Sequence, residues 1–150
     1  MKASNNIMSH PSETRTLTFI EKGILGFENE TQFTLSSYDE NTPFYWLKSI
    51  HNEEIAFMVI EPSILVQDYA FDLPDEVAQI LNIKTEADVF VLVILTIPEN
   101  PLDMSANLLG PLVFHKNENK GQQLILEHSH YPVQFPVFPE GLPKEESETK

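Results

Sequence analysis

The chain has 150 residues, of which 41% are hydrophobic, and a net charge of −14. This length suits one domain with its own core, so we predict a single domain over residues 13–138, between a flexible lead-in (1–12) and a flexible charged tail (139–150). The lack of cysteine excludes disulfides and thiolate sites, and no apolar run is long enough for a membrane helix. The N-terminus has no apolar export signal, so we expect a cytoplasmic protein.

The charge is concentrated in the body of the predicted domain. Residues 21–103 hold 16 acidic residues and 3 lysines, and Arg15 is the only arginine of the chain. A nucleic-acid-binding protein needs a basic face to neutralise phosphate, so we predict no direct nucleic-acid binding. The acidic surface serves solubility, or it attracts a basic partner, and the composition leaves both interpretations open.

Short apolar runs bounded by turn signals predict a series of strands. In chain order these strands cover residues 14–20, 33–35, 44–50, 55–60, 89–97, 109–114 and 122–126. The run at 89–97 is the clearest, because it is β-branched, uncharged and ended by Pro98. The last two strands flank a turn at 117–121 and are therefore expected to form a hairpin.

One short helix is predicted at about residues 75–83. Pro74 and the two acids after it suit a first helical turn, where proline is tolerated and negative charge faces the helix dipole. Val77, Ile80 and Leu81 then follow the spacing of a buried helical stripe. Many short strands and a single helix predict a mostly β fold, namely a small antiparallel barrel-like domain or a folded pair of sheets.

The residues that could carry chemistry form no strong motif. His128 and His130 would share one face of a strand and could bind a metal with His115, but exposed histidines near a strand end are ordinary. Neighbouring acids such as Glu53 and Glu54 are better explained as solvated loop residues than as a catalytic pair. We therefore predict no enzyme, no metal and no cofactor, with an acid–base hydrolase as an alternative.

Aromatic residues cluster at positions 44–46. Alternation along a strand would place Phe44 and Trp46 on one face and Tyr45 on the other. Core packing is the favoured interpretation, and an anchor for a protein partner is the alternative, because tryptophan and tyrosine are frequent in binding hot spots.

Four blocks of the sequence resemble, in order, the FliW family of flagellar assembly factors. They are residues 23–28 with Phe33 and Leu35, residues 43–49 followed by Ala56 and Phe57, residues 104–113, and residues 122–126 with Tyr131. The resemblance covers about residues 14–135. Two positions differ from the usual family pattern, since Gly110 stands where alanine is common and His115 where asparagine is common.

The resemblance implies a small, mostly antiparallel β-barrel-like domain that binds proteins and catalyses nothing. Proteins similar to this chain bind the RNA-binding translational repressor CsrA and relieve its repression of flagellin, and they also bind flagellin, which competes with the repressor. No small-molecule substrate and no membrane partner is expected. A more general acidic decoy of basic proteins remains an alternative.

We place the partner-binding residues in and near two motif loops, the first at residues 23–28 and the second at residues 105–108. The set comprises Gly23, Phe27, Glu28, Tyr45, Trp46, Asp103, Ser105, Asn107 and Leu108. An apolar groove for flagellin could come from exposed members of the runs at 44–47 and 108–112. The alternative for Gly23, Gly26 and Asn107 is that they serve turn geometry, because glycine and asparagine tolerate positive φ.

Overall fold

The computed structural model describes residues 1–4 and 14–139. Its strands are β1 (Lys2–Ser4), β2 (Arg15–Phe19), β3 (Gln32–Ser37), β4 (Tyr45–Ser49), β5 (Ala56–Ile60), β6 (Ala70–Asp72), β7 (Val89–Thr96), β8 (Ser105–Ala106), β9 (Leu112–His115), β10 (Lys120–Gln123) and β11 (Phe135–Pro136). Its helices are α1 (Asp75–Ile80) and the short 3-10 turns η1 (Pro62–Ile64), η2 (Glu86–Asp88) and η3 (Pro101–Asp103). None of these helices is long and apolar enough to cross a membrane.

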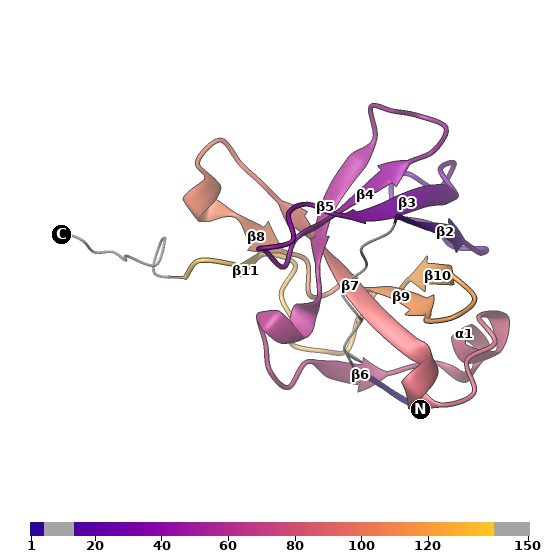
Figure 1. The fold of residues 1–150 in the computed structure, drawn as a ribbon. Helices are drawn as coiled ribbons and strands as arrows, with labels where there is room; N and C mark the ends of the chain where they lie inside the picture. The colour runs from indigo at the N-terminus through magenta and orange to yellow at the C-terminus, as the bar shows by residue number, and fades with distance from the viewer. Residues whose placement is uncertain (5–13, 140–150) are drawn as a thin grey trace.

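Seven strands close into a barrel, which confirms the predicted mostly β, barrel-like fold (Figure 1). The ring runs β7-β5-β4-β3-β2-β10-β9, and pairing of β9 with β7 completes it. Every neighbouring pair in the ring is antiparallel except β2 and β10, which are parallel. β8 and β11 extend the sheet beyond β7, and β1 pairs with β6 in a separate two-stranded sheet.

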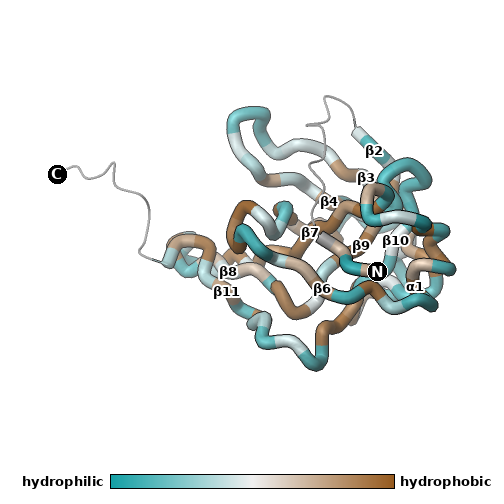
Figure 2. The backbone as a smooth tube through the Cα atoms, turned by 90° about the horizontal axis from the view of Figure 1, so that it is seen from below, coloured by the Kyte–Doolittle hydropathy of each residue, from teal (hydrophilic) through white to brown (hydrophobic). Residues whose placement is uncertain are grey.

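β7 is buried on both faces, which explains its uncharged sequence. Phe90 and Leu92 point into the barrel, where they join an aromatic-rich core. Val91 and Val93 point the other way and join a second core, outside the barrel wall. In Figure 2 the tube at β7 and β9 carries the brown colour of hydrophobic residues. A strand covered on both sides loses the polar–apolar alternation that marks a half-buried strand.

The barrel core and the outer core are built from different parts of the chain. The barrel core is built from the inward-facing residues of the ring strands together with Ile24, and includes Leu17, Phe19, Phe33, Leu35, Tyr45, Leu47, Val59, Phe90, Leu92, Leu112 and Phe114. The outer core packs one side of the ring against β1, β6, α1 and the irregular segments at 62–69 and 104–108. The molecule therefore has a closed barrel and a layer that covers part of its wall.

The predicted helix lies where α1 is found, but α1 ends at Ile80 rather than near residue 83. Leu81 closes the last turn, and Asn82 adopts a left-handed conformation with φ of 60°. The N–H of Ile83 then donates to the carbonyl of Ala78. Such a left-handed residue after the last turn ends a helix, and asparagine tolerates it.

Four strands of two or three residues have no counterpart in the sequence prediction: β1, β6, β8 and β11. Each exists through pairing with a distant segment, as when Lys2 lies opposite Asp72 and Ala106 lies opposite Phe135. Residues 2–4, placed in the flexible lead-in by sequence, are therefore part of a sheet. Residues 5–13 and 140–150, which hold most of the predicted lead-in and tail, lie outside the described residues.

Candidate functional site

The first motif loop, residues 23–28, follows β2 and contains hydrogen bonds among its own residues. Gly26 has a φ of +90°, which favours glycine, and its N–H donates to the Glu28 carboxylate at 3.1 Å. Backbone N–H groups of Gly26 and Glu28 lower the pKa of the Glu28 carboxyl below its ordinary value. Phe27 is 40% exposed and meets Phe57 edge to face, with ring centroids 5.1 Å apart. The loop thus presents an aromatic ring and a carboxylate to solvent.

The second motif loop is a turn organised by Asn107. Its Oδ1 accepts hydrogen bonds from the N–H of Leu109 at 3.1 Å and of Gly110 at 2.9 Å. Leu108 is fully buried, and its carbonyl accepts a hydrogen bond from the Tyr69 hydroxyl at 2.7 Å. Burial, and secondarily the neighbouring Tyr131, raises the pKa of Tyr69 above its ordinary value. The hydroxyl therefore stays protonated and acts as a permanent donor to this loop.

Gln123 joins the two motif loops, and the sequence analysis did not single it out as a site residue. Its Oε1 accepts from the N–H of Leu25 at 2.7 Å, and its Nε2 donates to the carbonyl of Gly110 at 2.9 Å. A Cβ at Gly110 would lie 2.9 Å from that Nε2 and 3.0 Å from Nδ2 of Asn107, so glycine leaves room for the link. Two neighbouring glutamines that are buried at the start of the apolar run 122–126 are the signal that could have revealed it.

β4 divides its aromatic pair between the two cores. Tyr45 is 5% exposed and faces the barrel core. Trp46 is half-buried on the outer side, where its ring lies 6.2 Å from the ring of Tyr38 and under Nζ of Lys48 at 5.5 Å. Strand register places Trp46 in one cross-strand row with residues of β5, β7, β8 and β11, namely Met58, Leu95, Ala106 and Phe135. Trp46 therefore shares a face of the sheet with the start of the second motif loop.

The nine predicted partner-binding residues differ in exposure. Phe27, Glu28 and Asp103 are exposed, Gly23, Trp46, Ser105 and Asn107 are intermediate, and Tyr45 and Leu108 are buried. Structurally they form two groups, the loop at 23–28 and the Trp46 to Asn107 face, with Gln123 between the two loops. The buried pair presents no side chain to a partner in this conformation.

The structure bears on two expectations about these loops. In the runs at 44–47 and 108–112, Leu47, Leu108 and Leu112 are fully buried, so only the partly exposed members Phe44, Trp46 and Leu109 could line an apolar groove. Of Gly23, Gly26 and Asn107, only Gly26 has the positive φ that the turn-geometry interpretation expected. Asn107 serves the turn in another way, because its side-chain oxygen accepts backbone hydrogen bonds. A Cβ at Gly23 would instead come within 3.4 Å of the Glu28 Cα.

A cavity of about 810 Å³ opens beside the first motif loop. Its walls come from four places: Lys2 of β1, the loop after β2, the β6–α1 region, and the end of β10 with the segment after it. Gly23 and Glu28 are the members of the predicted set that line it. Apolar side chains such as Phe71 and Val77 share its lining with several carboxylates.

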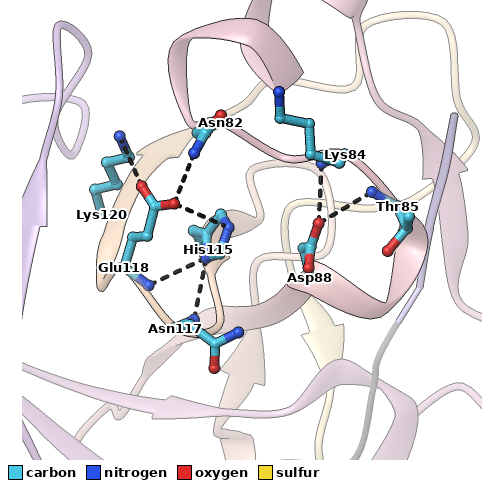
Figure 3. Close-up of polar contacts among 8 residues, drawn as sticks. All are labelled: Asn82, Lys84, Thr85, Asp88, His115, Asn117, Glu118 and Lys120. Carbon is cyan, nitrogen blue, oxygen red and sulfur yellow. Dashed lines mark hydrogen bonds and ion pairs between the residues drawn. The ribbon is translucent and has the colours of Figure 1, made fainter.

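His115 accepts hydrogen bonds within a turn (Figure 3). Among the described residues it does not form a metal-binding group with the other histidines. Its Nδ1 accepts from the N–H of Asn117 and of Glu118, both at 3.1 Å, and its Nε2 lies 3.6 Å from the Glu118 carboxylate. His128 and His130 are exposed. Within residues 1–4 and 14–139, no three His, Cys, Asp or Glu side chains are placed to hold a metal ion.

Two carboxylates near His115 are anchored by donors (Figure 3). The Asp88 carboxylate accepts from the N–H of Lys84 at 2.9 Å and of Thr85 at 3.0 Å, and these bonds lower the pKa of Asp88. The Glu118 carboxylate accepts from Asn82 at 2.7 Å and pairs with Lys120 at 3.0 Å, which lowers the pKa of Glu118. Both groups brace turns at one end of the barrel.

Comparison with known proteins gives one consistent result. The family model described as "FliW protein" matches residues 4–137. The flagellar assembly factor FliW of Caldicellulosiruptor saccharolyticus is 39% identical over 122 residues, which cover 81% of this chain and 80% of that protein. The Bacillus subtilis protein of the same name is 36% identical over 121 residues, covering 81% and 85%. A crystal structure of the flagellar assembly factor FliW matches with a TM-score of 0.75 and 33% identity, over 93% of this chain and 99% of that one.

Proposed function

The chain belongs to the FliW family of flagellar assembly factors, and on that premise we propose that it binds the translational repressor CsrA, relieving repression of flagellin translation, and also binds flagellin as a partner-switching chaperone. It acts in the cytoplasm as a protein-binding module without catalytic activity or cofactor. The family match over residues 4–137 is the observation that carries this proposal.

The charge of the chain supports an encounter with a basic partner. A repressor that grips RNA has a basic surface, and a body with 16 acids and 3 lysines over residues 21–103 attracts it and speeds association. Salt screens such charges beyond about 8–10 Å at physiological ionic strength. The acidic protein therefore docks close to the RNA-binding surface, or its binding reshapes the repressor.

The exposed members of the predicted site are the proposed contacts. Phe27 and Glu28 project from the first motif loop, and Asp103 projects just before the second. Trp46 offers a half-buried ring on the face that leads to Ser105. The remaining residues, Gly23, Tyr45, Asn107 and Leu108, hold these contacts in position.

Calorimetric titration tests the proposal with purified CsrA and, separately, with monomeric flagellin, at about 50 and 300 mM salt. We expect saturable binding to both proteins, with the repressor interaction weakening steeply as salt rises. Flagellin pre-bound to the protein should reduce binding of the repressor. Absence of binding to both partners at low salt would contradict the proposal, and equal binding to unrelated basic proteins would instead indicate a general decoy.

A charge-reversal pair tests where the repressor docks. The double variant Glu28→Lys, Asp103→Lys changes the net charge by the same amount as the control Glu53→Lys, Glu54→Lys, and all four carboxylates are exposed. We expect the first variant to slow association with CsrA at low salt more than the control does, because local charge acts over a short range. Equal slowing would show that only the overall charge matters and would remove the site assignment.

A further inference from the structure

β10 ends at Gln123, but the chain after it keeps forming antiparallel hydrogen bonds with residues 109–111, which precede β9. The N–H of Leu124 donates to the carbonyl of Pro111 at 2.9 Å, and the N–H of Leu126 donates to that of Leu109 at 2.8 Å. In an antiparallel pair, successive residues direct their backbone groups to opposite edges. Ile125 therefore directs its N–H and carbonyl away from the 109–111 segment.

At the opposite edge, β2 turns away after Ile20. The N–H of Ile20 donates to the carbonyl of Gly121, and the carbonyl of Ile20 accepts a hydrogen bond from Nε2 of Gln122 at 2.8 Å. Glu21 then adopts a left-handed conformation with φ of 67°, and the chain departs. Among the described residues, none forms a hydrogen bond with the backbone of Ile125.

The edge at Ile125, which no residue in 1–4 or 14–139 pairs with, borders the 810 Å³ cavity, where apolar surface is exposed to solvent. Ile125 and Leu25 both line the cavity, and they are 45% and 68% exposed. Phe71 and Val77 contribute further apolar lining. A backbone edge without a partner, next to exposed aliphatic side chains, is the arrangement that accepts an added strand.

Carboxylates outnumber ammonium groups around the cavity. The lining contains the acids Glu21, Glu28, Asp72, Glu76 and Glu127, and the lysines Lys2 and Lys22. Lys2 already pairs with Asp72, with Nζ and Oδ1 3.4 Å apart. The charge around the edge therefore complements a cationic ligand.

We propose that the edge at residues 123–127 binds an extended segment of a partner protein in which apolar side chains alternate with lysine or arginine. The segment takes the position that β2 leaves at Ile20, and its backbone pairs with the free N–H and carbonyl of Ile125. Its apolar side chains lie over Leu25 and Phe71, and its cationic side chains face the rim acids. Glu28 is common to this site and to the contacts proposed above, whereas Asp103 and Trp46 do not line the cavity. Strand addition at Ile125 goes beyond the proposed function.

Amide hydrogen exchange measured by NMR tests the pairing, with a short blocked peptide of alternating valine and lysine as probe. In the free protein we expect fast exchange at Ile125 and slower exchange at Leu124 and Leu126, whose N–H groups are already bonded. Saturating peptide should slow exchange at Ile125. Peptide binding without added protection at Ile125 would overturn the proposal.

Two matched pairs separate backbone pairing from charge attraction. The Ile125→Pro variant removes the free N–H, whereas the control Ile125→Val keeps it, and we expect roughly a tenfold loss of peptide affinity for the proline variant alone. A peptide with the same sequence, N-methylated on its pairing amides, should lose affinity for the unaltered protein, which avoids any folding defect of the proline variant. Equal affinity of both peptides would overturn strand addition.

Other occupants of the edge predict different results. If the chain's own residues covered it, Ile125 would already be protected in the dilute free protein. If a second copy covered it, that protection would appear as protein concentration rises, together with a dimer in sedimentation. Either result would overturn the proposal of a partner segment.

Discussion

The barrel core and the outer core share one strand, β7, yet they are built in different ways. The barrel core is enclosed by a complete ring of paired strands, so each strand is supported from both sides. The outer core is covered by β1, β6 and α1, which are three to six residues long, and by irregular chain. The comparison suggests that the barrel supplies the stability and that the covering layer can open by itself.

Single polar contacts matter more in the outer layer than in the barrel. The Tyr69 hydroxyl fixes the buried carbonyl of Leu108, and the Tyr131 hydroxyl bonds to both backbone groups of Ala70. These contacts join segments that make few ladder hydrogen bonds of their own. The following changes test the difference, from the largest expected effect to the smallest.

The largest effect is expected from paired leucine truncations on β7. Leu92 is fully buried in the barrel core and Leu95 is 6% exposed in the outer core. Leu92→Ala should cost about 3–5 kcal/mol in the free energy of unfolding, and Leu95→Ala about 2–3 kcal/mol, because the outer layer can relax around the lost volume. Urea unfolding of both variants measures this, and equal costs would remove the distinction between the cores.

A smaller effect is expected from removing one hydroxyl. Tyr69→Phe leaves the Leu108 carbonyl buried without its donor and should cost about 1–3 kcal/mol. The control Tyr131→Phe affects a residue that is only partly buried and should cost about 0.5–1.5 kcal/mol. Hydrogen exchange should show faster opening of β6 in the first variant while β3 and β4 stay protected; uniform acceleration would mean that the two regions open together.

Acid should weaken the barrel end where Asp88 lies. Because backbone donors hold the pKa of Asp88 below its ordinary value of 3.8, the ionised carboxylate stabilises the fold at higher pH, and this contribution is lost as pH falls from 3.8 through the folded-state pKa. Asp88→Asn should therefore lower stability at pH 7 and make little difference at about pH 2. Thermal unfolding of the variant and of the unaltered protein across this pH range tests whether their stabilities become equal at low pH. A stability difference that stays the same at every pH would contradict the prediction.

The smallest effect is expected from His115→Asn. Asparagine offers a side-chain oxygen that can accept from the N–H groups of residues 117 and 118, as Nδ1 of His115 does. We expect a change in stability within about 1 kcal/mol. His115→Leu, which has no acceptor, is the control and should cost more; equal effects of the two variants would show that the turn does not need the bond.

The sequence predicted the barrel better than the layer around it. Six of the seven ring strands carry apolar residues in a pattern that is visible along the chain. β10 has the sequence Lys-Gly-Gln-Gln, and the predicted strand at 122–126 overlaps it only at Gln122 and Gln123. β6 and β8 are too short to show a period, and they form only when distant segments meet. The role of Gln123 could not be predicted because it also depends on distant segments meeting. Its side chain bonds to Leu25 and to Gly110, which lie in two other parts of the chain.

The parallel pairing of β2 with β10 has a consequence for synthesis. Ile20 and Gln122, which bond across this pair, are 102 residues apart, so the barrel cannot close until most of the chain has been made. The hairpins from β2 to β5 can form early, but they leave Leu17, Phe19 and Phe33 without the strands that later cover them. A topology with such distant pairs closes slowly, and nascent chains halted before residue 120 should therefore be recovered as aggregates rather than as shorter folded proteins.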